Sequence, residues 1–198
     1  MLQRTVHLCQ GVFGMPLRLR VYKGMTKKQN NWSKDVFNIL KAANVRQVAY
    51  VPDAGHSSLI KMAIADNSIK PVLLTSEQEG VAVLSGAWLG GEAGTLLMQS
   101  SGVGNVINML GMANECRFPL LMLVTMRGEW GEFNPWQVPM GQATESVLTA
   151  AGVIVHRVDD ESEIAETVEA AAKLSFEGGR MVAVLIGQRV VGFKDWKK

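Results

Sequence analysis

The sequence predicts an α/β fold in which a doubly wound, mostly parallel sheet of six strands carries helices on both faces. Short apolar runs alternate with helical patterns from Asn31 onward, and strands separated in this way by helices form parallel sheets. The chain has 198 residues, of which 47% are hydrophobic and 19% charged, so one domain can bury a sizeable core. The run Pro119–Thr125 is apolar throughout, as expected for a strand covered on both faces.

The individual elements follow from periodicity and from turn residues. The predicted strands are Val45–Val51, Val72–Thr75, Thr95–Gln99, Pro119–Thr125, Val153–Val158 and Met181–Ile186. The predicted helices are Ser33–Ala43 with Ser33 as its cap, Ser57–Ala65, Glu79–Gly90, Gly104–Asn114, Thr144–Ala151 and a last one that ends at Phe176. Asp160 and Glu163 form a capping box for the last helix.

Charge divides the chain into two parts. Residues 1–30 contain six basic residues and no acidic one, whereas residues 31–198 carry a net charge of −4. We expect residues 1–30 to be a basic extension, either disordered or the product of a start codon assigned too early, with Met25 as the alternative start. Residues 31–198 are expected to form a single domain, which is mildly acidic and therefore not suited to nucleic acid.

Two further classes are excluded by composition. No apolar stretch reaches about 18 residues, so a membrane-spanning helix is not expected. Only Cys9 and Cys116 are present, which argues against a disulfide framework or a cysteine-rich metal site and favours a cytoplasmic protein. Cys116 is expected to be a buried thiol.

Candidate chemistry lies in the four loops that follow strands, since ligands of open parallel sheets bind at the carboxyl ends of strands. These loops are residues 52–57, 75–79, 99–105 and 126–141. Residues 99–105 read Q-S-S-G-V-G-N, and glycines before a helix allow a ligand to approach the backbone. Gly102-x-Gly104 alone is weak evidence for a dinucleotide, because Ile107 stands where that motif needs a small residue. A P-loop is excluded, since no G-x-x-x-x-G-K-[ST] occurs.

The four loops together resemble a known family. Ser76-Glu77-Gln78, with Gly86 nine positions after Glu77, is similar to the start of a helix in the aminopyrimidine-binding domain of thiamine diphosphate enzymes. Residues 99–108, Q-S-S-G-V-G-N-V-I-N, resemble a motif of phosphonopyruvate and sulfopyruvate decarboxylases. Arg127-Gly128 and the run Q-V-P-M-G at 137–141 fit the same group. The likeness is closest to the α subunit of two-chain sulfopyruvate decarboxylase and covers residues 33–186.

The resemblance implies that Glu77 is catalytic. In that family the glutamate hydrogen-bonds N1′ of the aminopyrimidine and so activates the cofactor, which attacks a 2-oxo acid; CO2 and then an aldehyde are released. Two alternatives stay open: a solvated carboxylate at a helix start, and Glu79 as the functional residue, although the spacing to Gly86 prefers Glu77. The resemblance also implies a cofactor pocket lined by Gln99, Ser100, Ser101, Gly102, Gly104 and Asn105. The alternative is a turn that only packs strand against helix, with Asn105 and Asn108 as cap residues.

His56 and Arg127 are candidates for contact with the substrate. His56 follows the first predicted strand, where an imidazole suits proton transfer or binding of a carboxylate; the related subunits often lack a histidine here. Arg127 suits an anionic group such as a carboxylate, sulfonate or phosphonate, and the alternative is a salt bridge at the surface or between subunits. The loop with Trp130, Phe133 and Trp136 is expected to cover an active site or to lie under a partner chain.

The cofactor's other half-site is missing from the sequence. Thiamine diphosphate enzymes hold diphosphate and Mg²⁺ with G-D-G followed by N-N, and no G-D-G occurs here. The resemblance therefore implies an α subunit of a 2-oxo acid decarboxylase, a carbon–carbon lyase active only with a β subunit that holds Mg²⁺, and no metal ligands in this chain. Three alternatives stay open: a related carboligase or decarboxylase with another 2-oxo acid, a non-catalytic binding module of the same fold, and a dinucleotide-dependent oxidoreductase.

Overall fold

Six strands form one sheet in the order β2-β1-β3-β4-β6-β5, and every pair of neighbours is parallel. The computed structural model describes residues 32–193; the basic extension and the alternative start at Met25 expected from the sequence lie outside them. The strands are β1 Val45–Tyr50, β2 Lys70–Leu73, β3 Ala93–Gln99, β4 Leu120–Thr125, β5 Ile154–Val158 and β6 Met181–Ile186. The predicted doubly wound α/β fold is confirmed.

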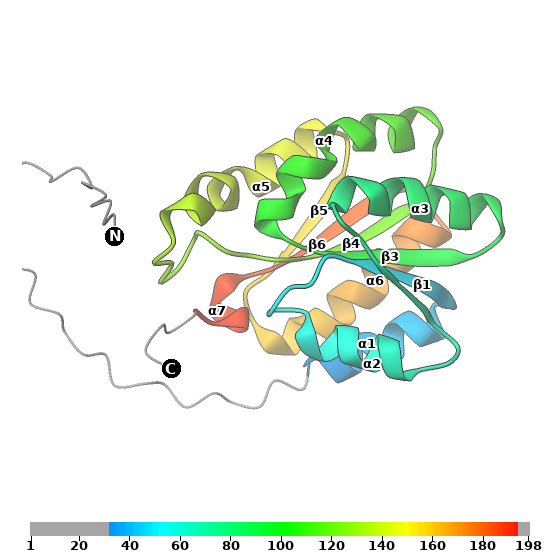
Figure 1. Ribbon diagram of the computed structural model, residues 1–198, viewed down its shortest axis with the longest axis horizontal. Helices are drawn as coiled ribbons and strands as arrows, with labels where there is room; N and C mark the ends of the chain where they lie inside the picture. The colour runs from blue at the N-terminus through cyan, green and yellow to red at the C-terminus, as the bar shows by residue number, and fades with distance from the viewer. Residues whose placement is uncertain (1–31, 194–198) are drawn as a thin grey trace, which may run out of the picture.

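Helices cover both faces of the sheet (Figure 1). One face carries α1 Trp32–Ala42, α2 Ser57–Ala65 and α6 Ile164–Phe176, and the other carries α3 Glu77–Leu89, α4 Ser100–Glu115 and α5 Val138–Ala150. The short helix α7 Gln188–Val191 follows β6, and the 3-10 turns η1 Pro135–Gln137 and η2 Glu161–Glu163 precede α5 and α6. None of the helices within residues 32–193 has the length and apolar character needed to cross a bilayer.

Two neighbouring interior strands, β4 and β6, show why the core has two layers. Every residue of β4 and β6 is buried, with alternate side chains entering a core on either side of the sheet. Since parallel strands covered on both faces expose no polar side, such runs are continuous in apolar residues. The run predicted as a doubly covered strand is therefore confirmed.

Several boundaries differ from those predicted, mostly where a helix starts. Ser33 lies inside α1 and is not its cap. Helix α4 starts at Ser100, directly after β3, so residues 100–105 are helical and do not form a loop. Helix α5 starts at Val138 and has Pro139 in its first turn. Proline is tolerated there because backbone N–H groups of the first turn have no partner within the helix, so the missing N–H costs no hydrogen bond. The long connection after β4 is correspondingly shorter than expected.

Two other expectations were wrong. Strand β2 lies two residues earlier than predicted and contains Pro71, which is tolerated because β2 is at the edge of the sheet and pairs only with β1. Cys116 is exposed and not buried, and it lies just after the last residue of α4.

The topology places a switch point at the carboxyl ends of β1 and β3. From β1 the chain turns to α2 on one face, and from the neighbouring strand β3 it turns to α4 on the other. Open α/β sheets bind ligands at such a switch point, beyond the carboxyl ends of the strands. The predicted site residues follow these strand ends.

Candidate functional site

The carboxyl group of Glu77 lies between two helices at the carboxyl edge of the sheet. Glu77 is the first residue of α3, and its side chain is directed at the first turns of α4, which packs beside α3. Asn105 Nδ2 donates a hydrogen bond to Glu77 Oε2 at 2.8 Å. The residue is only 8% exposed, so the alternative of a freely solvated carboxylate is wrong. Glu79 is different, because it is exposed and accepts hydrogen bonds from the backbone and side chain of Thr75.

Gly102 makes this arrangement possible. A Cβ atom on Gly102 would collide with the Glu77 carboxyl, so the carboxyl occupies the space that any other side chain would fill. Gly104 is exposed one position before Asn105, and Met140 Sδ lies 3.3 Å from where a Cβ of Gly104 would stand. In this structure the two glycines of Gly102-x-Gly104 leave room for the side chains of Glu77 and Met140. This role differs from contact with a dinucleotide, which the sequence motif left open as an alternative.

A second group of side chains joins the ends of β1, β3 and β4 through Asp53. Asp53 Oδ1 accepts from Gln99 Nε2 at 2.9 Å, and Oδ2 accepts from Thr125 Oγ1 at 2.6 Å and from the backbone N–H of Gly55 at 3.1 Å. Gln99 Oε1 in turn accepts from Ser101 Oγ at 2.8 Å. Burial acts to raise the pKa of Asp53, but interaction with His56 and these hydrogen bonds hold it below its usual range. Sequence reasoning missed Asp53 and Thr125, although both stand at the ends of predicted strands.

His56 lies beneath this group and is fully buried. Its Nε2 is 3.0 Å from the carbonyl oxygen of Leu123, and because a carbonyl only accepts, Nε2 carries the proton. Nδ1 has no hydrogen-bond partner among the described residues, and the ring meets Trp32 edge to face. Burial lowers the pKa of His56, against the raising effect of Asp53. The structure does not bring His56 to Glu77, and its role at the substrate stays a prediction.

Arg127 is held in a third group. Its Nε and Nη2 donate to Glu132 at 2.6 and 2.7 Å, and the two side chains are 7% and 3% exposed. Glu132 also accepts from the backbone of Asn134 and from Gln188, which is fully buried. The buried Ser100 hydroxyl accepts from the Arg127 N–H and donates to its carbonyl. The Arg127 guanidinium and the Ser100 hydroxyl, both expected to contact a ligand, are thus hydrogen-bonded within the chain. Arg127 as a substrate contact stays a prediction.

The start of α4 connects the three groups. Gln99, Ser100 and Gly102 belong to the Asp53, Arg127 and Glu77 groups respectively. Within residues 32–193, no three His, Cys, Asp or Glu side chains lie close enough together to hold a metal ion. The carboxyl edge of the sheet therefore holds one largely buried carboxyl group, that of Glu77, which the Asn105 amide orients. Beside it lie the exposed residues Ser101, Gly104 and Asn105.

Comparison with protein families decides the kind of site. Residues 30–137 match the family described as "Thiamine pyrophosphate enzyme, N-terminal TPP binding domain", and this match includes the Glu77 group and the Asp53 group. The chain belongs to this family. Thiamine pyrophosphate is thiamine diphosphate under another name, so the resemblance seen in the motifs is confirmed.

Curated relatives of this thiamine pyrophosphate enzyme are decarboxylases. The chain is 33% identical over 155 residues to the sulfopyruvate decarboxylase subunit alpha of Methanothermobacter thermautotrophicus, covering 78% of this chain and 94% of that one. Its identity to the subunit alpha of Methanococcus maripaludis is 32%, over 79% of this chain and 94% of that one. It is also 33% identical to the phosphonopyruvate decarboxylase of Streptomyces viridochromogenes, covering 69% of this chain and 35% of the relative.

A solved structure supports the fold. The 2-oxoglutarate:ferredoxin oxidoreductase from Magnetococcus marinus aligns with a TM-score of 0.62 and 14% identity, over 81% of this chain and 29% of that one. The expected similarity to decarboxylases and the expectation of an enzyme are confirmed by the relatives. The individual roles of Glu77 and of the residues from Gln99 to Asn105 stay predictions.

Gly102→Ala tests the packing of the site in this thiamine pyrophosphate enzyme. The new methyl group must displace the Glu77 carboxyl, and we expect the free energy of unfolding to fall by about 1–3 kcal/mol. Gly111→Ala, in the same helix, is the matched control, because nothing lies within 4 Å of its added Cβ; it should stabilise the protein by about 0.5–1 kcal/mol. Urea denaturation followed by circular dichroism measures both. Equal effects of the two substitutions would contradict the described packing.

The ion pair of Arg127 and Glu132 predicts a pH dependence of stability. Burial acts to raise the pKa of Glu132, but its hydrogen bonds and the charge of Arg127 outweigh it and lower the pKa from 4.5 to about 2. A lowered pKa means that the stabilisation is complete above pH 4.5 and is lost as the pH falls towards 2. Glu132→Gln should cost about 3–5 kcal/mol near pH 6, because it leaves Arg127 buried and unpaired. The difference from wild type should shrink between pH 4.5 and 2 in denaturant titrations; a constant difference would contradict the assignment.

Proposed function

We propose that this chain is the α subunit of a two-chain, thiamine diphosphate-dependent 2-oxo acid decarboxylase. Its substrate would resemble sulfopyruvate or phosphonopyruvate and would yield CO2 and an aldehyde. The relatives named subunit alpha match over 94% of their own length, which supports an equivalent subunit here. Two cysteines in 198 residues suit a cytoplasmic enzyme.

The geometry around Glu77 carries the proposal. A carboxyl group is the natural partner of a ring nitrogen such as N1′ of an aminopyrimidine, and Glu77 holds one, largely buried, at the carboxyl ends of the strands, where ligands bind in this fold. Asn105 fixes one of its oxygen atoms, and Gly102 adds no side chain beside the other. The residues present therefore fit the aminopyrimidine of thiamine diphosphate, which when bound supplies the electron sink for the loss of CO2.

Each residue of the edge has a distinct part in this proposal. Glu77 holds or moves a proton at N1′, and Asn105 keeps its carboxyl in one orientation. Ser101, Gly104 and Asn105 border the cofactor with groups open to solvent. Gln99 is oriented by Asp53, since its amide donates to one carboxylate and accepts from Ser101. Ser100 contributes by fastening the segment after β4, because its hydroxyl bonds to the Arg127 backbone.

The proposal requires a second subunit. The chain contains no G-D-G sequence, and no metal-binding group of side chains is found in the part of the chain that the structure describes. We infer that a β subunit supplies the diphosphate and Mg²⁺ sites, so that the active site forms between the two chains.

Glu77→Gln in the two-subunit enzyme tests the proposed function. The amide keeps the shape but cannot hold or transfer the proton, and we expect kcat for the 2-oxo acid to fall by about 10²–10⁴-fold. Glu79→Gln is the matched control two residues away, because Glu79 is exposed and its carboxylate accepts hydrogen bonds from Thr75; it should retain activity. CO2 release from a panel of 2-oxo acids with sulfonate, phosphonate and uncharged side chains is the measurement. Full activity of Glu77→Gln would refute the assignment, and absence of decarboxylation by wild type would leave the binding-module alternative.

A further inference from the structure

An uncharged segment with several exposed apolar side chains lies beside the site, between β4 and the middle of α5. Residues 133–144 contain no charged side chain, although 19% of the whole chain is charged. Trp136 is 87% exposed, Phe133 44% and Val138 38%, and the neighbouring Pro135 and Pro139 are exposed as well. We call these five residues the aromatic surface. Exposed aromatic and apolar groups without charge are typical of the core of protein–protein interfaces.

The segment that carries this surface is held rigidly from within. Glu132, just before Phe133, accepts hydrogen bonds from both sides of the loop, including Arg127 and Asn134. Gln188 of α7 accepts from the backbone N–H groups of Glu129 and Trp130. Asn134 Oδ1 accepts from the Trp136 N–H and so caps η1. Because the network already orders this loop in the single chain, binding of a partner through Trp136 loses little conformational entropy.

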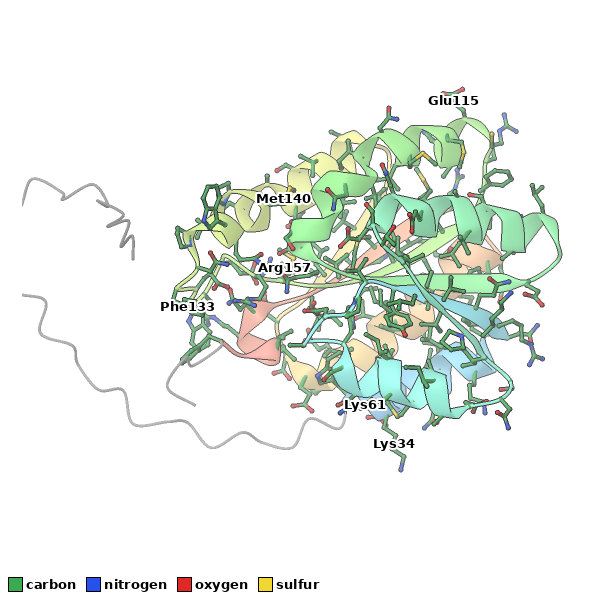
Figure 2. All side chains as sticks on the ribbon, viewed as in Figure 1. Lys34, Lys61, Glu115, Phe133, Met140 and Arg157 are labelled. Carbon is green, nitrogen blue, oxygen red and sulfur yellow. The ribbon has the colours of Figure 1, made fainter. Side chains whose placement is uncertain are left out.

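The aromatic surface is continuous with the Glu77 site. η1 leads directly into α5, and Met140 follows Trp136 by about one turn. Met140 Sδ lies against Gly104, next to the Asn105 that binds Glu77. Figure 2 shows Phe133 and Met140 at the end of the molecule where the strands terminate, whereas Glu115 lies at the opposite end. The aromatic surface therefore lies beside the route by which a partner would reach Glu77.

From this continuity we infer that the aromatic surface is the docking site for the β subunit that carries the diphosphate and Mg²⁺ sites, with Trp136 as its main anchor. The inference rests on the proposed function, which requires that subunit to close over Glu77. Tryptophan is the residue type most enriched among the few side chains that dominate binding energy in interfaces. The occupant is a folded chain and not the cofactor, because Phe133 and Val138 extend the apolar surface to both sides of Trp136.

The test measures binding between the full chain and the G-D-G-containing chain encoded in the same genome, without cofactor or substrate. Trp136→Ala should weaken the Kd at least about 30-fold by titration calorimetry, and Val138→Glu should also weaken it by placing a charge in the interface. Trp88→Ala is the matched control, since Trp88 is 36% exposed near the far end of α3; it should change Kd by less than about threefold. Circular dichroism verifies that each variant is folded.

Three outcomes would overturn the inference: an unchanged Kd for Trp136→Ala, an equal loss for Trp88→Ala, or self-association of this chain that Trp136→Ala abolishes. The last would assign the surface to a second copy. Decarboxylation is assayed separately on the wild-type complex. A complex that depends on Trp136 but has no decarboxylase activity would support docking at the aromatic surface and refute the proposed function. An active complex whose Kd is unchanged by Trp136→Ala would support the proposed function and refute docking at the aromatic surface.

Discussion

The site depends on the contact between the Glu77 carboxyl at the start of α3 and the first turns of α4. The two helices start at opposite sides of β1, after β2 and after β3, and meet only because the chain crosses over β1 between them. Their packing holds a polar group at 8% exposure, which is acceptable because Asn105 hydrogen-bonds it. Any shift of α4 would therefore change both the burial and the orientation of the carboxyl.

The rest of the carboxyl edge fixes α4 in place. Asp53 connects the ends of three strands, and its bond to Gln99 holds the residue from which α4 starts. Ser100 joins the helix to the segment after β4, which the buried pair of Arg127 and Glu132 holds in turn. Polar networks of this kind stabilise one arrangement when all members are satisfied, and here that arrangement presents Glu77 and the aromatic surface at the same edge.

Much of the fold could be predicted from the sequence, and less of the site. β6 and α2 have the bounds that their apolar runs and periodicity predict. The family's spacing to Gly86 preferred Glu77 over Glu79, and the structure buries Glu77 and leaves Glu79 exposed; the catalytic role of Glu77 stays a prediction. The start of α4 was misplaced because Gly102 and Gly104 suggest a loop, whereas their contacts with Glu77 and Met140 compensate for their weak helix propensity. The Asp53 bonds join residues 46 and 72 positions apart, and such pairings depend on the assembled sheet, which no local pattern encodes. The burial of His56 and the engagement of Arg127 were missed for the same reason.

The central claim is that this chain supplies half of a shared thiamine diphosphate site. The most direct measurement is a calorimetric titration of thiamine diphosphate with Mg²⁺ into this chain alone and into its complex with the G-D-G-containing subunit. The account predicts saturable binding by the complex and none by the isolated chain, because in the proposed arrangement Glu77 and its neighbours would contact only the aminopyrimidine half of the cofactor. Binding of equal strength by this chain alone, or no binding by the complex, would contradict it.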